Sequence, residues 1–229
     1  MKLRVAYGLV ALSVVPLIGG VMRLVGIADG DAATMDARFV QSPLPVVMHI
    51  LAASLFSVLG AFQFEGDLRR AWPRWHRNAG RILVLGGLLT AATGVWMTLR
   101  YAIPPPLQGG LLFGVRLVVG GGMALALVLA VRVILQGDVA AHRAWMLRAY
   151  ALGQGAGTQV LFLLAPQLLS GQAVTGMLRD VLMTAAWLAN VLVAEFVIRT
   201  GTHRPAEVRL GPSHRHRAPP SGASSQRTA

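Results

Sequence analysis

Long runs of apolar residues recur along this chain and restrict its fold more than any other feature. A helix needs about 20 apolar residues to cross roughly 30 Å of hydrocarbon. Six runs have that length, and they cover residues 4–26, 44–64, 80–99, 111–135, 145–169 and 178–198. Membrane-spanning strands need only about 10 residues with strict alternation, which these runs lack. The pattern predicts an all-α, polytopic transmembrane bundle of six helices.

The composition agrees with a membrane protein. Of the 229 residues, 55% are hydrophobic and 13% are charged, whereas a soluble domain carries about 25% charged residues. The first run follows Lys2 and Arg4 as a signal peptide would, but it is too long and lacks a small-residue cleavage site, which predicts a retained helix. The chain has no cysteine, which excludes disulfides, thiolate metal sites and a cysteine nucleophile.

The basic residues predict the orientation of the bundle. Lys and Arg accumulate in cytoplasmic loops, and six crossings bring the N-terminus, the second and fourth connections and the C-terminal tail to one side. That side holds sixteen of the 21 Lys and Arg residues. Both termini are therefore predicted to be cytoplasmic, and the protein is predicted to lie in the cell membrane. Because topology accounts for the net charge of +12, nucleic-acid binding is not expected.

The C-terminal tail differs in composition from the rest of the chain. Residues 200–229 are rich in Pro, Ser, Gly and Arg and poor in apolar residues, so they cannot bury enough surface to fold alone. We expect a transmembrane domain over residues 1–199 and a disordered, basic cytoplasmic tail over 200–229. Such a tail is attracted to anionic lipid headgroups.

Two basic segments, each beginning with a histidine, enter predicted spans from the cytoplasmic side. His76 and His142 are candidate axial ligands of one haem b, because neutral imidazole is a common haem ligand. The cations beside them are candidates for propionate or headgroup contacts, and they are Arg77, Arg81, Arg143 and Arg148. Snorkelling of these cations to the lipid phosphates is the simpler alternative. A metal site at His76 and His142, completed by Glu195, is a further hypothesis.

Polar residues inside predicted spans are costly and are therefore candidates for function. These residues are His49, Gln63, Arg116, Gln159, Asn190 and Glu195. His49 either ligates a second haem, with Met97 as partner and Arg116 at the propionates, or is hydrogen-bonded to a helix carbonyl. Gln63 and Asn190 are candidates for hydrogen bonds between helices. Glu195 has Arg132, Arg148 or the two cytoplasmic histidines as partners, and Arg116 has Asp180.

Several motifs occur in an order that resembles a family of predicted bacterial membrane proteins, domain of unknown function 2306. The motifs are HI at 49–50, GAFQF at 60–64, LRR at 68–70, HRNAGRI at 76–82, GD…HRAWMLRAYAL over 137–152 and WLANVLVAE at 187–195. The resemblance covers about residues 40–198 and supports the helical fold and the choice of residues, but it implies no reaction. One departure is Gln159, because the family pattern has an arginine partway along this helix.

Three functions are consistent with these observations. The first is a haem-binding redox protein, and the second is a transporter or proton-coupled permease. Against the transporter, no span is clearly interrupted near its middle, as many transporter sites require. The third is an accessory protein that organises lipid or partner proteins. The sequence contains no H-E-x-x-H, G-x-S-x-G or P-loop motif, so it identifies no catalytic residues.

Overall fold

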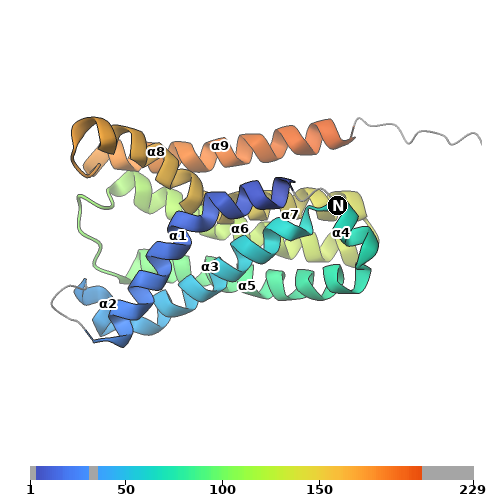
Figure 1. Cartoon of the computed structure of the whole chain (residues 1–229), viewed down its shortest axis with the longest axis horizontal. Coiled ribbons are helices and arrows are strands. Elements are labelled where there is room, and N and C mark those ends of the chain that lie inside the picture. The colour runs from blue at the N-terminus through green and yellow to red at the C-terminus, as the bar shows by residue number, and fades with distance from the viewer. Residues whose placement is uncertain (1–3, 31–35, 203–229) are drawn as a thin grey trace, which may run out of the picture.

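The computed structural model describes residues 4–30 and 36–202, and all of its regular elements in those ranges are helices (Figure 1). They are α1 (Arg4–Ala28), α2 (Ala37–Gln41), α3 (Pro43–Gln63), α4 (Gly66–Ala71), α5 (Pro73–Arg100), α6 (Gly110–Leu135), α7 (Val139–Gly153), α8 (Gly155–Ser170) and α9 (Gly176–Thr202). The all-α prediction is confirmed for this part of the chain. The predicted disordered tail lies almost wholly outside the described residues.

Five helices are long and apolar enough to cross a membrane, namely α1, α3, α5, α6 and α9. Each coincides with a predicted apolar run, although α5 begins at Pro73 because proline at the first helical position has the backbone angle that a helix requires. Large apolar side chains cover the outer surface, for example Leu85 at 70% and Val118 at 74% exposed. An apolar outer surface suits a lipid environment and would be unfavourable in water.

The fifth predicted span is interrupted, and the expectation of an unbroken span was wrong. It consists of α7, with 15 residues, and α8, with 16 residues, separated at Gln154. The last carbonyls of a helix lack hydrogen-bond donors within that helix. For α7, side chains of α9 supply these donors. Trp187 Nε1 donates to the carbonyl of Leu152 at 3.1 Å, and Asn190 Nδ2 donates to that of Ala151 at 3.1 Å. These contacts stabilise the break.

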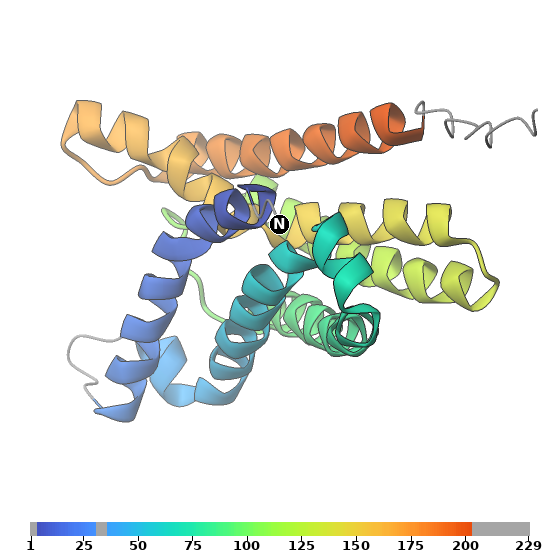
Figure 2. The same cartoon turned by 45° about the vertical axis from the view of Figure 1, so that its right-hand side comes forward.

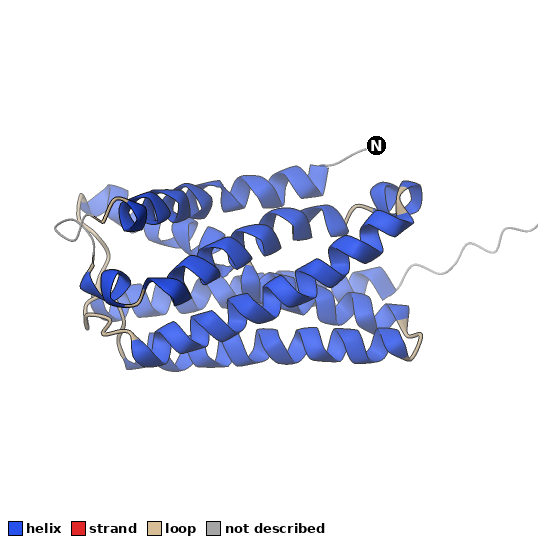
Figure 3. Ribbon diagram, turned by 90° about the horizontal axis from the view of Figure 1, so that it is seen from below, coloured by secondary structure: helices blue, strands red, loops and turns tan. Residues whose placement is uncertain are grey.

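The long helices run side by side, and the connections gather at two ends (Figures 1 and 3). The start of α1 and the end of α9 lie at one end, together with the α3–α5 and α6–α7 connections. The opposite end contains the α5–α6 and α8–α9 connections, which meet where Gly176 N–H donates to the Pro106 carbonyl at 2.8 Å. Consequently α7 and α8 together extend over the length of the bundle.

The core lies where α3, α5, α6 and α7 meet, and α1 packs against α3 and α8 (Figure 2). Phe56, Leu83, Leu127 and Tyr150 are buried there. Small residues allow the helices to approach closely. A side chain on Gly60, for example, would begin 2.6 Å from the Tyr150 ring. This core supports one end of a central cavity.

Candidate functional site

A cavity of about 630 Å³ lies between the long helices. Its lining comes from every helix except α4, and the walls are mostly apolar. The volume lies within the range of about 300–1,000 Å³ that is typical of small-molecule sites. The cavity is therefore the candidate functional site, and its lining includes four of the predicted site residues, His49, Met97, Arg116 and Gln159.

The interruption between α7 and α8 forms part of the cavity wall. Leu152, Gly153, Gln154 and Ala156 all line the cavity. The buried Gln154 amide donates to Ser13 Oγ at 2.7 Å and to the Leu9 carbonyl at 3.1 Å. Its Oε1 atom is buried and has no hydrogen-bond partner among the described residues. Gln154 was not predicted as a site residue, although Gly153 and Gly155 on either side of it are a signal of close packing.

His49 is held against α5. Its Nδ1 atom lies 3.0 Å from both the Thr90 carbonyl and Thr93 Oγ1, and because a carbonyl only accepts, this nitrogen carries the proton. A side chain on Gly94 would begin 3.3 Å from the His49 ring. The structure thus agrees with hydrogen bonding to a helix carbonyl, one of the two interpretations of this residue.

Four arginines line one end of the cavity, and they are Arg23, Arg38, Arg116 and Arg179. We call them the arginine cluster. Arg38 pairs with Asp36 at 2.6 Å, and Arg23 lies over the Phe39 ring with its guanidinium carbon 4.3 Å from the centroid. Arg116 donates to the Gln108 side chain, and Arg179 Nε donates to the Leu107 carbonyl at 3.3 Å.

Asp180 acts electrostatically on Arg116, as expected, but its carboxylate oxygens are hydrogen-bonded elsewhere. Asp180 is 2% exposed and accepts hydrogen bonds from the backbone N–H groups of Gly109 and Leu112, both at 3.1 Å. These groups belong to the start of α6, where unsatisfied N–H donors and the helix dipole favour a carboxylate. Asp180 therefore caps α6 and fixes α9 against it.

Tyr101 closes the same end of the bundle and was not anticipated from the sequence. Its hydroxyl donates to the Ser42 carbonyl at 2.6 Å, and its ring makes edge contacts with Phe39 and Trp96. Burial raises the pKa of the Tyr101 phenol, because removal from water disfavours the charged form. Tyr101 thus remains a neutral donor that joins α3 to the end of α5.

The predicted haem and metal residues His76 and His142 lie near each other at the opposite end, on α5 and α7. His142 Nδ1 is 2.9 Å from the Ala130 carbonyl, and His76 Nδ1 is buried without a partner in the described part of the chain. Among residues 4–30 and 36–202, no group of three or more His, Asp or Glu side chains could hold a metal ion. The structure does not bring Glu195 to the histidines.

Glu195 instead pairs with Arg148. Arg148 Nε and Nη2 donate to the two carboxylate oxygens of Glu195 at 2.5 and 3.1 Å, which joins α7 to α9. The Arg148 guanidinium also stacks on Trp145, 4.6 Å from the ring centroid. The other candidate cations for propionate or headgroup contacts, Arg77, Arg81 and Arg143, are exposed. Exposed arginines at a helix end suit contact with lipid headgroups.

The other predicted intramembrane polar residues contact neighbouring helices or are buried without a partner. Asn190 Oδ1 accepts from the Thr158 hydroxyl at 2.7 Å, in addition to its bond to α7. Gln159 Nε2 donates to the Met183 carbonyl at 3.4 Å. Gln63 Nε2 is buried without a partner in the described residues. Asn190 and Gln159 thus hold α8 to α9.

The comparison with known families agrees with this architecture. Residues 46–198 match the family described as "Predicted membrane protein (DUF2306)". The chain belongs to this family. The match confirms the resemblance noted in the sequence, and it extends over the DUF2306 helices α3 to α9, including the interruption at Gln154. It begins after α1 and α2, so Arg23 and Arg38 lie outside it. No curated protein and no solved structure matches the chain.

Proposed function

We propose that this DUF2306 protein is a membrane transporter that carries a membrane-borne ligand through its central cavity. The observation that supports this proposal most strongly is the interruption between α7 and α8, whose residues line the cavity. Transporter sites near the middle of the bilayer are typically built from interrupted helices, because the unwound backbone there can meet a ligand. The interruption removes the main argument from the sequence against transport.

The contacts of Gln154 connect the interruption to α1. Two hydrogen bonds from its amide tie the interruption to α1, while Oε1 lacks a partner among the described residues. Hinges are short segments at the ends of elements that absorb changes in backbone angle. Rotation of α8 about Gln154, with α1, would open the cavity toward one leaflet and close it toward the other.

The proposal includes six crossings of the cell membrane, with α7 and α8 together forming the fifth, and with both termini in the cytoplasm. The excess of basic residues at the end where α1 starts and α9 ends supports this orientation. The exposed arginines at that end would contact anionic headgroups. Contact between the α5–α6 and α8–α9 connections supports a complete crossing by α7 and α8.

Cysteine labelling tests this topology. Because the chain contains no cysteine, an introduced cysteine is the one site on this protein that a maleimide can label. Single substitutions at exposed connection residues are Pro105→Cys, Gln136→Cys and Gln172→Cys. In intact cells, a membrane-impermeant maleimide is expected to label Pro105→Cys and Gln172→Cys, and to label Gln136→Cys only after lysis. Protection of Gln172→Cys beside full labelling of Pro105→Cys would mean that α7 and α8 do not cross.

Lipid translocation in proteoliposomes tests transport. We expect the protein to accelerate the movement of fluorescent lysophosphatidate between leaflets, measured as loss of inner-leaflet fluorescence after adding dithionite. Ala53 lines the cavity, so Ala53→Phe is expected to obstruct it and return the rate to that of protein-free liposomes. Leu55→Phe is the matched control, because Leu55 is 42% exposed on the same helix. Equal rates with and without the wild-type protein would overturn the transporter.

Haem binding is the weaker proposal for this cavity. In its favour, His49, Met97 and Arg116 all line the cavity. Against it, His49 of α3 is hydrogen-bonded to Thr90 and Thr93 of α5, and Met97 also belongs to α5. Both side chains therefore come from one wall, and a haem between them would require α3 and α5 to separate. The His76 and His142 site stays a hypothesis, and neither histidine lines the central cavity.

A further inference from the structure

We infer that the arginine cluster binds the carboxylate or phosphate group of an amphiphilic ligand whose apolar part occupies the rest of the central cavity. This inference names the ligand class of the proposed transporter and rests on that proposal for its biological meaning. Binding itself is a separate property, and it can be measured whether or not the ligand is moved across the bilayer.

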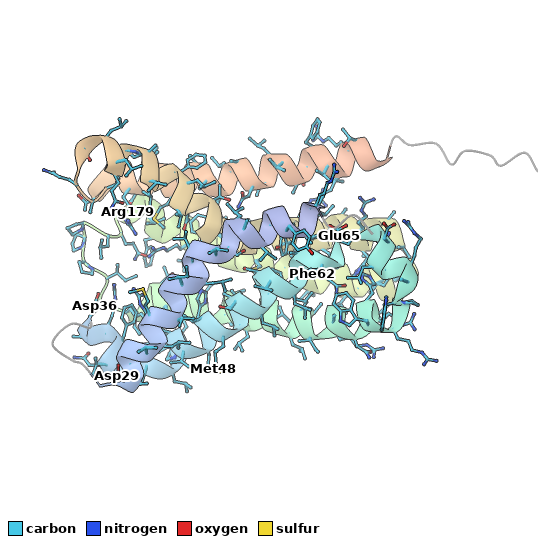
Figure 4. All side chains as sticks on the ribbon, viewed as in Figure 1. Asp29, Asp36, Met48, Phe62, Glu65 and Arg179 are labelled. Atoms are coloured by element: carbon cyan, nitrogen blue, oxygen red, sulfur yellow. The ribbon has the colours of Figure 1, made fainter. Side chains whose placement is uncertain are left out.

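The four arginines reach the cavity from four different helices, α1, α2, α6 and α9. Figure 4 labels Arg179 and Asp36 at the same end of the bundle. The cations are close enough to repel one another, since Arg38 and Arg179 both act on Arg116 and Arg38 acts on Arg23. Gathering like charges among apolar helices is unfavourable unless negative charge balances them.

The described residues supply only part of that balance. Asp36 is their only carboxylate in an ion pair with the cluster, through Arg38. Asp180 also carries negative charge near Arg116 and Arg179, but its two oxygens accept hydrogen bonds from the start of α6. Within residues 4–30 and 36–202, Asp36 and Asp180 are the carboxylates that act on these four cations. A bound anion would add negative charge beside the arginines.

Hydrogen-bond donors also remain for such an anion. Arg38 Nε is buried and has no partner in the described part of the chain. Arg116 uses donors on Gln108, and Arg179 uses Nε on the Leu107 carbonyl, whereas each guanidinium carries five N–H groups. The planar arrangement of these donors matches the paired oxygens of a carboxylate or phosphate.

The cavity wall beyond the cluster determines the rest of the ligand. Away from the arginines, it is formed largely by apolar side chains, among them Ile50, Met123 and Leu152. This wall favours a ligand with an apolar part, because binding removes the apolar surfaces of the wall and of the ligand from contact with water or lipid headgroups. A ligand with one anionic group and a hydrocarbon chain satisfies both halves of the cavity.

Quenching of Trp187, which lines the cavity, measures binding directly. The protein in phosphatidylcholine nanodiscs is titrated with ω-bromoundecanoate, ω-bromoundecyl phosphate or uncharged ω-bromoundecanol, because bromine quenches tryptophan nearby. We expect saturable quenching by at least one anion, with an affinity about tenfold or more above that of the alcohol, since charge-assisted hydrogen bonds are the strong ones. The tighter anion identifies the headgroup chemistry. Trp187→Phe is expected to remove the saturable component.

Variants of the cluster decide whether the arginines are responsible. Arg116→Gln is expected to weaken anion binding about tenfold and leave alcohol binding unchanged, as expected for loss of a charge-assisted hydrogen bond, while Arg116→Lys should retain part of the affinity. The matched control is Arg100→Gln, because Arg100 is exposed and lies outside the cavity. Equal affinity for anions and alcohol, or unchanged anion affinity in folded Arg116→Gln, would overturn the inference.

The two proposals fail separately. Anion binding without lipid translocation would overturn the transporter and leave the binding site intact. Translocation that Ala53→Phe abolishes but Arg116→Gln leaves unchanged, together with equal affinities for anion and alcohol, would retain the transporter and overturn the anion site.

Discussion

Replacement of Asp180 by alanine is expected to lower the free energy of unfolding by about 2–3 kcal/mol, as for loss of a charged acceptor that leaves buried donors unsatisfied. Asp180 is 2% exposed and accepts from two backbone N–H groups at the start of α6. Its removal leaves these donors unsatisfied and withdraws negative charge from Arg116 and Arg179. Denaturant titration of the protein in mild detergent, followed by circular dichroism, measures the change.

Two variants separate these contributions. Asp180→Asn retains an oxygen acceptor but loses the charge, so we expect a smaller destabilisation than for Asp180→Ala. Asp29→Ala removes an exposed carboxylate and is expected to change stability by less than about 0.5 kcal/mol, as most surface substitutions do. If Asp180→Ala unfolded at the same denaturant concentration as Asp29→Ala, the cap on α6 would contribute nothing to stability.

The second large effect is expected for Phe56→Ala, which should lower the free energy of unfolding by about 3–5 kcal/mol. The causes are the loss of packing contacts and the cavity left behind. Phe56 is 2% exposed, and its ring lies 5.8 Å from that of Tyr150, between centroids. The ring occupies the space that side chains on Gly87 and Gly153 would need, since both would begin 2.7 Å from it. The same denaturant titration measures the loss.

Leu55→Ala is the matched control for Phe56→Ala, because the neighbouring Leu55 is 42% exposed. A lipid-facing leucine makes few contacts within the protein, so its truncation is expected to cost less than about 1 kcal/mol. Similar stabilities of the two variants would contradict the assignment of Phe56 to the core. Because Phe56 packs against Gly153, next to the α7–α8 interruption, the Phe56 variant should also slow lipid translocation.

The runs at 44–64 and 111–135 became α3 (Pro43–Gln63) and α6 (Gly110–Leu135), with ends that differ by at most one residue. A membrane-spanning helix satisfies its backbone hydrogen bonds within its own segment, so its position can be predicted from local apolarity. The partner of Glu195 could not be chosen in this way, because several cations were equally near in the sequence pattern.

By itself, the sequence determined that this DUF2306 protein is helical, that it belongs in a membrane, and where its long apolar helices lie, because length and apolarity are properties of each segment alone. Only the tertiary structure decided the interruption at Gln154 and the arginine cluster. The interruption depends on Trp187 and Asn190 of another helix, and the cluster joins residues from four helices. Such features arise from contacts between distant segments, and hydrophobic periodicity carries no information about those contacts.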